Sequence, residues 1–405
     1  GGGIFHDAQM HHPPRLVVSM LRSAHRDGAV LANYAEVTEL VREGTRVVGA
    51  RVTDREGGGS LEIRARVVVV AAGAWSDELL PRGRAGGRRE AATFSRDVCL
   101  VTDIPARHGC ALAVPGGGRD PDALLSRSGR HLFVVPWLGR LIVGVWHRVH
   151  EPRPDELELR EEEVEGFVGE VAEACPGLGL TPRRVVAHNT GLVLVEDRGP
   201  EDTSPRFGKR SRLVDHRREG LEGLVSIVGV RLTTARYDAA RTLDLAAEQL
   251  PGSVAPCRTA RTPLFGADFE TVAGLRDEVA SSWEGLSAEA VETLWRCYGS
   301  AHGRVRDRVT CPELGRPLPG SRVLGAEVVH AVREEMALHL DDVVLRRTVL
   351  GAHGPPDEDA LEAASRIMAR EAGWDEARRR RELALARDAA AGPAAVLPAR
   401  THRGP

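Results

Sequence analysis

Two stretches of the sequence place small residues, hydroxyls and a cation where a strand gives way to a turn or a helix. The first is 67–73, Val-Val-Val-Val-Ala-Ala-Gly, a continuously apolar run typical of a strand buried on both faces. The second is 229–236, Gly-Val-Arg-Leu-Thr-Thr-Ala-Arg. Small residues let the backbone approach a planar or phosphorylated ligand, and a helix N-terminus offers free N–H groups with a partial positive charge. Both stretches are therefore candidate ligand sites, with a plain turn and an N-cap by Thr233 or Thr234 as the alternatives.

The composition excludes several classes of protein. With 405 residues, 42% of them hydrophobic and 28% charged, the chain is long enough for a sizeable core and for two domains. A net charge of −3 provides no global positive field for nucleic acid. The six cysteines form no C-x-x-C pair and the histidines no cluster at metal spacing, so we expect no metal site. No apolar run approaches the ~20 residues that span a bilayer.

Hydrophobic periodicity predicts a mixed α/β (α+β) chain. We expect a helix over 13–28, a strand over 29–34, a hairpin of 46–52 with 60–65, and a strand over 223–229 that leads into a helix. Antiparallel strands are expected between about 83 and 195, notably 132–137 and 140–146 joined through Leu138-Gly139, with a helix over 155–174 between them and the later strands. Beyond 270 the pattern is helical, over 288–298, 326–340 and 358–390.

These elements predict a domain over 1–270, a helical C-terminal domain over 271–392 and a tail over 393–405. The run Arg378-Arg379-Arg380-Arg381 is interpreted as a solvated helix face rather than a binding site. The start, Gly1-Gly2-Gly3-Ile4, has neither an initiating Met nor a buried first strand, so we expect a segment upstream of it.

A series of segments, taken in order, resembles one family. They are 4–9 (Ile-Phe-His-Asp-Ala-Gln), 15–17 (Arg-Leu-Val), 33–37 (Asn-Tyr-Ala-Glu-Val), 46–52 (Arg-Val-Val-Gly-Ala-Arg-Val), 70–75 (Val-Ala-Ala-Gly-Ala-Trp), 133–137 (Phe-Val-Val-Pro-Trp), 232–234 (Leu-Thr-Thr), 333–337 (Arg-Glu-Glu-Met-Ala) and 345–348 (Leu-Arg-Arg-Thr). The family is that of the aerobic, FAD-dependent glycerol-3-phosphate dehydrogenases. The resemblance covers nearly the whole chain and implies an incomplete Rossmann-like FAD-binding domain, an antiparallel-sheet substrate domain and a helical C-terminal domain.

The resemblance also implies roles for individual residues. Glu36 and Val37 would lie at the adenine end of FAD, and Ala71, Ala72, Gly73 and Trp75 close to the cofactor. The isoalloxazine and the substrate would be met by Gly229, Val230, Leu232, Thr233 and Thr234. The implied reaction is hydride transfer from C2 of glycerol 3-phosphate to the flavin, which gives dihydroxyacetone phosphate, with electrons passed to a quinone. The protein must then supply orientation, a base for the hydroxyl proton and cations for the phosphate.

The chain departs from the family pattern at the cofactor and substrate motifs. No Gly-x-Gly-x-x-Gly follows a first strand, so weak FAD binding is expected for the chain as it stands. Arg231 replaces the usual lysine, Cys99 stands where a candidate base histidine is expected, and the usual arginine is lost at Gly191-Leu192-Val193-Leu194. Arg212, in Lys209-Arg210-Ser211-Arg212, matches a phosphate-binding arginine. The candidate catalytic residues are therefore Arg212, Arg231 and His147, the last with a purely structural histidine as its alternative.

Two other functions stay open beside the dehydrogenase. Arginine clamps bind carboxylates as well as phosphates, so an FAD-dependent amine or amino-acid oxidase is the second enzyme class. A degenerate, non-catalytic relative is the third. The expected partners are a small anionic substrate and a quinone or other electron acceptor, with no nucleic acid, and the expected location is the cytoplasm. Peripheral contact with the inner face of the membrane and a homodimer remain open.

Overall fold

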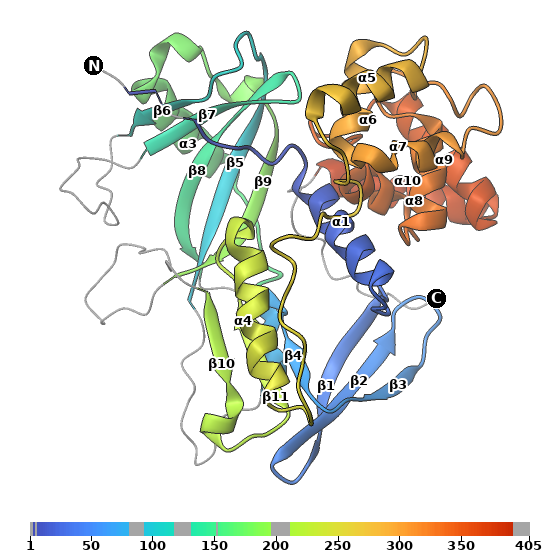
Figure 1. Ribbon diagram of the computed structural model, residues 1–405. Coiled ribbons are helices and arrows are strands. Elements are labelled where there is room, and N and C mark those ends of the chain that lie inside the picture. Colours follow the sequence, from blue (N-terminus) through green and yellow to red (C-terminus); the bar gives the residue numbers. More distant parts are fainter. Residues whose placement is uncertain are drawn as a thin grey trace.

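The computed structural model describes residues 3–4, 6–80, 93–116, 131–150, 153–195 and 211–391. Figure 1 shows an antiparallel sheet standing above a smaller sheet that is partly parallel, a second small antiparallel sheet beside the latter, and a separate group of helices. This arrangement confirms the predicted mixture of sheets with an all-helical C-terminal region. The predicted tail over 393–405 lies outside the described residues.

The largest sheet has five antiparallel strands in the order β6-β7-β8-β5-β9. The strands are β5 (Phe94–Pro105), β6 (Leu112–Pro115), β7 (His131–Trp137), β8 (Arg140–His150) and β9 (Val185–Leu194). The predicted turn at Leu138-Gly139 joins β7 and β8, and both of its residues have the positive φ that suits a tight hairpin. One face of the sheet packs on α3 (Glu161–Ala174), where Phe167 stacks on Trp146. This helix is shorter than the expected 155–174, because the residues before Glu161 form turns and extended chain.

The second sheet has the order β10-β11-β4. Its strands are β10 (Arg212–Asp215), β11 (Leu224–Val228) and β4 (Val68–Val70), and the last two are parallel. The short 3-10 turns η1 (Gly73–Trp75) and η6 (Leu232–Thr234) follow β4 and β11, and lead into α2 (Ser76–Leu79) and α4 (Ala235–Ala247). The turn η5 (His216–Glu219) lies between β10 and β11. The predicted strand over 67–73 is wrong in its length, because the strand ends at Val70.

The third sheet is the antiparallel meander β1-β2-β3. Its strands are β1 (Ala35–Glu43), β2 (Arg46–Asp54) and β3 (Ser60–Arg64), so the predicted hairpin is confirmed. The strand expected over 29–34 is wrong, since that segment is irregular and the strand begins at Ala35. It extends instead through 35–43, where Leu40 is buried against Val47 and Val70, residues that belong to β2 and β4.

Helices make up the C-terminal region, together with the N-terminal helix α1 (Pro13–Arg26) that lies against it. They are α5 (Val272–Ser282), α6 (Ala288–Tyr298), α7 (His302–Arg306), α8 (Gly325–Glu334), the π-helix η8 (Asp342–Arg347), α9 (Glu358–Ala372) and α10 (Glu376–Ala391); the remaining 3-10 turns are η3 (Pro176–Leu178), η4 (Pro182–Arg184) and η7 (Gly299–Ala301). The predictions of single helices over 326–340 and 358–390 are wrong. The first ends before Met336, whose φ is positive, and the second is broken at Gly373, which adopts the left-handed conformation.

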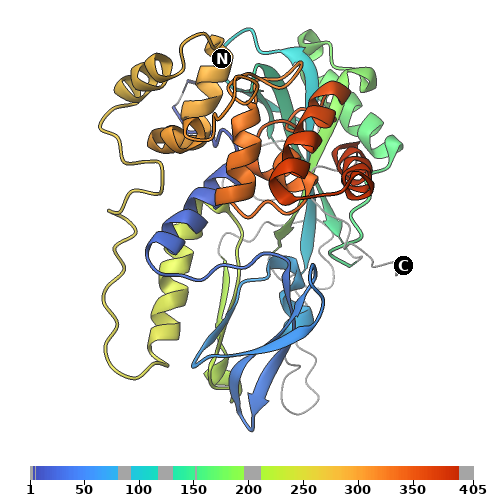
Figure 2. The same cartoon turned by 90° about the vertical axis from the view of Figure 1, so that its right-hand side faces the viewer.

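An extended connection links α4 to the helical region. Figure 2 shows segment 248–271 running along the outside of the molecule from α4 to α5, and residues 251–263 are exposed throughout. The predicted boundary near 270 falls at the end of this connection and stays a prediction. None of the described helices combines the length and the apolar composition that crossing a bilayer requires.

Ion pairs join the helical region to the rest of the chain. His339 lies between Glu56 of the β2–β3 turn, at 2.7 Å, and Glu382 of α10, at 2.9 Å. Arg378 adds a longer pair to Glu56 at 3.7 Å, and Arg379 of the same helix is bound to Glu362 at 2.9 Å. The interpretation of the arginine run as a solvated face is therefore wrong for these two arginines and holds for the exposed Arg380 and Arg381.

Three histidines lie where the tip of the β7–β8 hairpin meets the N-terminal segment and the helical region. Trp137 donates to the backbone oxygen of His11 at 2.7 Å and packs edge-on against His353 at 5.6 Å. Burial lowers the pKa of His11 and of His353 to about 4, with Arg296 acting further on the first and Arg140 on the second. Burial and then Arg15 lower the pKa of His12 to about 3. The folded junction therefore keeps all three rings neutral.

This junction predicts a loss of stability in mild acid. The unfolded chain takes up a proton at each histidine near its ordinary pKa of 6.5, whereas the folded chain does not until the pH falls to about 4. The unfolded state is therefore favoured progressively as the pH drops below 6.5, with an upper limit of about 1.4 kcal/mol per pH unit per histidine. Because His11 and His353 are only half-buried, we expect the three histidines to contribute a loss of roughly 1–3 kcal/mol between about pH 7 and about pH 5.5. Glu327, whose pKa burial raises to about 7, takes up its proton in the folded chain over the same window and partly offsets this loss.

Urea unfolding at the two pH values measures this effect. Ordinary carboxylates titrate near about 4–4.5, below this window, and so contribute little to the difference. His12→Gln should reduce the pH dependence, whereas the same change at the exposed His6 should not alter it. A pH dependence that is the same in His12→Gln as in the original chain would contradict the assignment.

Candidate active site

The two candidate ligand stretches lie side by side because the strands that precede them are neighbours. In the parallel ladder Leu224 pairs with Val68 and Ser226 with Val70. Parallel strands end at the same edge of a sheet, so the residues after β4 and those after β11 emerge together. The predicted meeting of the segment around Ala72 with the segment around Thr233 is thus a property of the sheet register.

A small apolar cluster closes this edge from the side of the five-stranded sheet. Phe94 and Leu194, at the ends of β5 and β9, pack with Val228, the last residue of β11. Ala74 and Val230 lie against the same cluster, one from each candidate stretch. The edge of the small sheet and the lower end of the large sheet are therefore in contact.

Glycines leave open space at this edge. A Cβ added at Gly73 or at Gly229 would meet no atom within 4 Å. Gly73 also has a φ of 57°, a conformation that side chains rarely adopt, so the turn after β4 requires glycine there. Ala71 and Trp75 are exposed and Ala72 is half-exposed. A flat ligand could approach the backbone here without displacing any side chain.

The entrance to α4 differs from the N-cap that the sequence left open. Thr234 is the N-cap residue of α4, but its hydroxyl makes no capping bond to the helix. It donates instead to Asp238 at 2.8 Å, and its backbone N–H donates to the carbonyl oxygen of Arg231 at 3.3 Å. The neighbouring Thr233 is exposed and Leu232 is half-exposed.

His147 lies on the strand face that points away from α3. Its neighbour Trp146 packs on α3, and successive residues of a strand point to opposite faces. His147 pairs across the sheet with Asp97 of β5, and its Nδ1 lies 2.9 Å from an Asp97 carboxylate oxygen. Ser95 Oγ donates to the same oxygen at 2.8 Å. The Asp97 carboxylate lies where it would form an ion pair with a protonated imidazole, so the pair can stabilise positive charge on His147.

Cys99, which stands at the position of the expected histidine, is unsuited to act as a base. Burial, and then the nearby Asp97, raise the pKa of its thiol to about 11. Its Sγ would lie 2.5 Å from a Cβ at Gly144, so this glycine is the residue that lets β5 and β8 approach at that point. Among the predicted residues in this sheet, His147 is therefore the remaining candidate base.

The strand register relates the position of His147 to that of the cluster formed by Phe94, Leu194 and Val228. Asp97 is three residues along β5 from Phe94, which corresponds to about 10 Å of extended chain. His147 is three residues from His150, the cross-strand partner of Phe94. His147 thus lies three residues along its strand from the end of the sheet that carries the Phe94 cluster.

The two arginines flank the same edge. Arg212 is the first residue of β10 and pairs with Val228, the last residue of β11. Arg231 is exposed and is the residue immediately before η6. Lys209 and Arg210, named with Arg212 in the sequence motif, lie outside the described residues.

Glu36 and Val37 are not part of this arrangement. Both are exposed on β1, in the separate meander, and Glu36 is ion-paired with Arg55. Their role at the adenine end of a cofactor stays a prediction.

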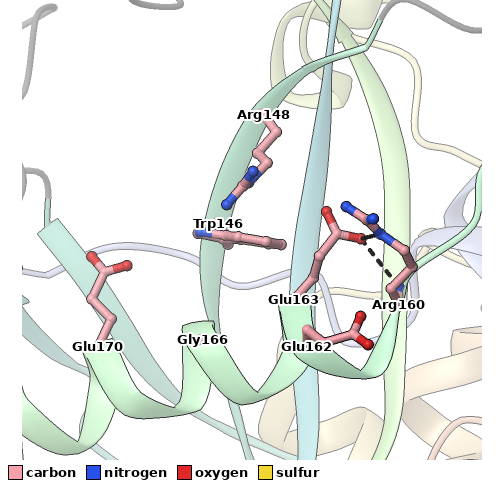
Figure 3. A pocket seen from close by; sticks show the side chains of 7 residues that line it. All are labelled: Trp146, Arg148, Arg160, Glu162, Glu163, Gly166 and Glu170. Carbon is pink, nitrogen blue, oxygen red and sulfur yellow. Dashed lines mark hydrogen bonds and ion pairs between the residues drawn. The ribbon is translucent and has the colours of Figure 1, made fainter.

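A surface pocket of about 370 Å³ lies on the other face of the five-stranded sheet (Figure 3). Its residues come from β8 and α3, and they are Trp146, Arg148, Arg160, Glu162, Glu163, Gly166 and Glu170. Arg148 covers the Trp146 ring at 4.6 Å, and Glu163 is held by Arg96 and Arg160. Arg160 pairs with Glu163 within this pocket, and none of its residues was predicted for the site, so it is not the candidate active site.

Three residues of the site were not anticipated from the sequence. Asp97, Ser95 and Asp238 are ordinary polar residues at strand and helix positions, and no motif marks them. The spacing Ser-x-Asp on a strand does place two polar side chains on one face, which was a usable signal for Ser95 and Asp97. Asp238 had no such signal, because its partner Ser211 lies 27 residues away.

Comparison with protein families agrees with this geometry. Residues 1–235 match the model described as FAD dependent oxidoreductase, and residues 257–379 match the C-terminal domain of alpha-glycerophosphate oxidase. The first match alone spans more than half of the chain. The chain belongs to the FAD-dependent oxidoreductase family.

Known family members similar to this oxidoreductase chain are glycerol-3-phosphate dehydrogenases. One from Synechocystis sp. is 27% identical over 365 residues, which are 86% of this chain and 64% of that protein. Glycerol-3-phosphate dehydrogenase 2 of Mycobacterium tuberculosis is 29% identical over 390 residues, 95% of this chain and 63% of that protein. The chain thus spans somewhat less than two thirds of these relatives.

A solved structure of the family has the same fold. The glycerol-3-phosphate dehydrogenase of Bacillus halodurans, complexed with FAD, superposes with a TM-score of 0.73 at 25% identity, over 95% of this chain and 74% of that one.

The residues present fit the ring end of FAD. The open space at Gly73 and Gly229, the exposed small residues after β4 and the helix entrance after β11 form the kind of edge at which a flavin ring lies against backbone. The Gly-x-Gly-x-x-Gly that would hold the pyrophosphate is not in this sequence. The fit therefore concerns the ring of the cofactor and the stretches 71–75 and 229–234, whose role in binding stays a prediction.

Proposed function

We propose that this chain forms the flavin-ring and substrate part of a glycerol-3-phosphate dehydrogenase. The reaction oxidises the secondary alcohol at C2 of sn-glycerol 3-phosphate to the ketone of dihydroxyacetone phosphate. Bound FAD supplies the acceptor for the two electrons and the hydrogen that leave C2. In this proposal Ala71, Ala72, Gly73, Trp75, Gly229, Val230, Leu232, Thr233 and Thr234 bind the ring, and Glu36 and Val37 contact the adenine end.

The chain's own side chains would perform the rest of the chemistry. The imidazole of His147 accepts the proton of the C2 hydroxyl, and Asp97 stabilises the imidazolium that results. Arg212 and Arg231 bind the phosphate, whose two negative charges match two guanidinium groups. Burying the substrate at the edge would strengthen each of these contacts, because charge–charge interactions grow as water is excluded.

One observation carries the proposal. The register of β4 with β11 brings the two small-residue stretches to one edge, and the Phe94 cluster joins that edge to the sheet that holds the His147–Asp97 pair. The proposal assigns an electron acceptor, an anion clamp and a base to this region of the molecule. An amine or amino-acid oxidase would bind a different substrate there, and a non-catalytic relative would bind none.

The electron acceptor and the assembly belong to the same proposal. We infer a quinone as the acceptor, a cytoplasmic location with peripheral contact at the inner face of the membrane, and a homodimer. These parts rest on the resemblance to the family, and the contacts described above do not depend on them.

Anaerobic titration tests the proposal directly. The purified chain is first titrated with FAD, and we expect weak binding, seen as a change in flavin absorbance and fluorescence. Glycerol 3-phosphate should then bleach the bound flavin, while glycerol, amino acids and simple amines should not. Bleaching by an amino acid or amine would favour the oxidase. The absence of FAD uptake by a well-folded chain, even with FAD in large excess, would support the non-catalytic relative.

A further inference from the structure

One carboxylate accepts hydrogen bonds from both of the segments that carry the two arginines. Asp238, in the first turns of α4, accepts a hydrogen bond from Ser211 Oγ at 2.7 Å and one from Thr234 Oγ1 at 2.8 Å. Ser211 Oγ also accepts from the backbone N–H of Val230 at 3.3 Å. The carboxylate thus joins the residue before β10, the loop after β11 and the entrance of α4.

The members of this network are direct neighbours of the anion-binding candidates. Ser211 precedes Arg212, and Val230 precedes Arg231. Thr234 donates its backbone N–H to the carbonyl oxygen of Arg231. The backbone at both arginines is therefore held, through at most one intervening residue, by Asp238.

We propose that Asp238 is a positioning residue that sets the spacing of Arg212 and Arg231 for a phosphate-sized dianion. The inference rests on the proposed function, because it assigns these arginines to one anion. Asp238 itself touches neither substrate nor cofactor in this proposal. Its carboxylate fixes two backbone segments, since the ladder between β10 and β11 ends at the Arg212–Val228 pair, before the loop begins.

A role limited to helix stability would have a different pattern of contacts. An acidic residue near a helix N-terminus stabilises the helix by its charge alone, wherever its side chain points. Asp238 instead uses one oxygen to accept from two hydroxyls, one of which belongs to a residue 27 positions earlier. The cross-chain bond to Ser211 contributes to the geometry of the site rather than to α4.

The experiment compares Asp238→Ala, Asp238→Asn and Ser211→Ala with a matched control. The control is Asp244→Ala. Asp244 is an exposed aspartate of the same helix, and among the described residues its side chain has no hydrogen bond or ion pair to another element. Two quantities are measured on the chain without added FAD: hydrogen–deuterium exchange of the amides over 229–236, and the dissociation constant for inorganic phosphate by calorimetry. Circular dichroism and a thermal melt establish that each variant is folded.

We expect Asp238→Ala to speed exchange at the Val230 amide and its neighbours and to raise the phosphate dissociation constant, each by about tenfold, as losing two hydrogen bonds allows. Asp238→Asn and Ser211→Ala should have smaller effects, and the Asp244 variant should behave as the unmodified chain. Unchanged exchange in Asp238→Ala would overturn the inference. So would faster exchange with unchanged phosphate affinity. If the unmodified chain binds no phosphate, the anion clamp in the proposed function fails first, and the positioning role falls with it.

Discussion

His147→Gln is expected to lower kcat by roughly 100- to 10,000-fold, the range typical of losing a general base. Glutamine keeps the size and polarity of the ring but cannot take a proton at neutral pH. The Asp97 carboxylate 2.9 Å from Nδ1 and the Ser95 hydroxyl on the same oxygen would remain in place, so the fold should be little affected. The measurement is steady-state or single-turnover flavin reduction by glycerol 3-phosphate with protein saturated in FAD.

A second histidine of the same sheet provides the control. His188 on β9 contacts Thr190 at 3.2 Å, and Thr190 pairs with Val98, which packs toward α3. His188→Gln therefore removes an imidazole from the opposite face and should leave kcat within about threefold. Asp97→Asn should lose less than His147→Gln, because the base would remain but lack its orienting charge. Normal flavin reduction in His147→Gln would show that the proton leaves by another route.

Glu335→Ala is expected to reduce the free energy of unfolding by about 3–5 kcal/mol, since it leaves a buried guanidinium without its partner. Arg15 of α1 and Glu335, at the end of α8, lie 2.5 Å apart with side chains 7% and 1% exposed. Burial alone would raise the pKa of Glu335, but Arg15 and His330 outweigh it and bring the pKa to about 2. Urea unfolding at neutral pH measures the loss.

Two variants distinguish a lost ion pair from a lost side chain. Glu284→Ala removes an exposed glutamate of the helical region and should change stability by less than about 0.5 kcal/mol. Arg15→Met combined with Glu335→Leu removes both charges and should recover a large part of the loss. Because the folded pKa of Glu335 is depressed, its contribution is present above about pH 4.5 and is lost as the pH falls toward 2. A Glu335→Ala chain as stable as the original would mean that Arg15 finds water or another acceptor.

Elements with a strong local pattern could be predicted from the sequence. The hairpin turn at Leu138-Gly139, the helix over 13–26 and the apolar strand before Gly73 follow from side-chain periodicity and from glycine. Predictions failed where a tertiary contact decided the backbone. The strand expected at 29–34 forms instead at 35–43, where Leu40 reaches the core, and the helix expected to continue to 340 stops before Met336.

Residue types and their order along the chain determined the family, the expectation of a flavin site after two strands and the choice of His147, Arg212 and Arg231. Only the tertiary structure decided which groups act together. The parallel register of β4 and β11, the pairing of Asp97 with His147 and the bond from Ser211 to Asp238 join residues 27 to about 150 positions apart. Such contacts depend on how sheets pack and align, and a periodicity that repeats every two to four residues carries no information about partners at that separation.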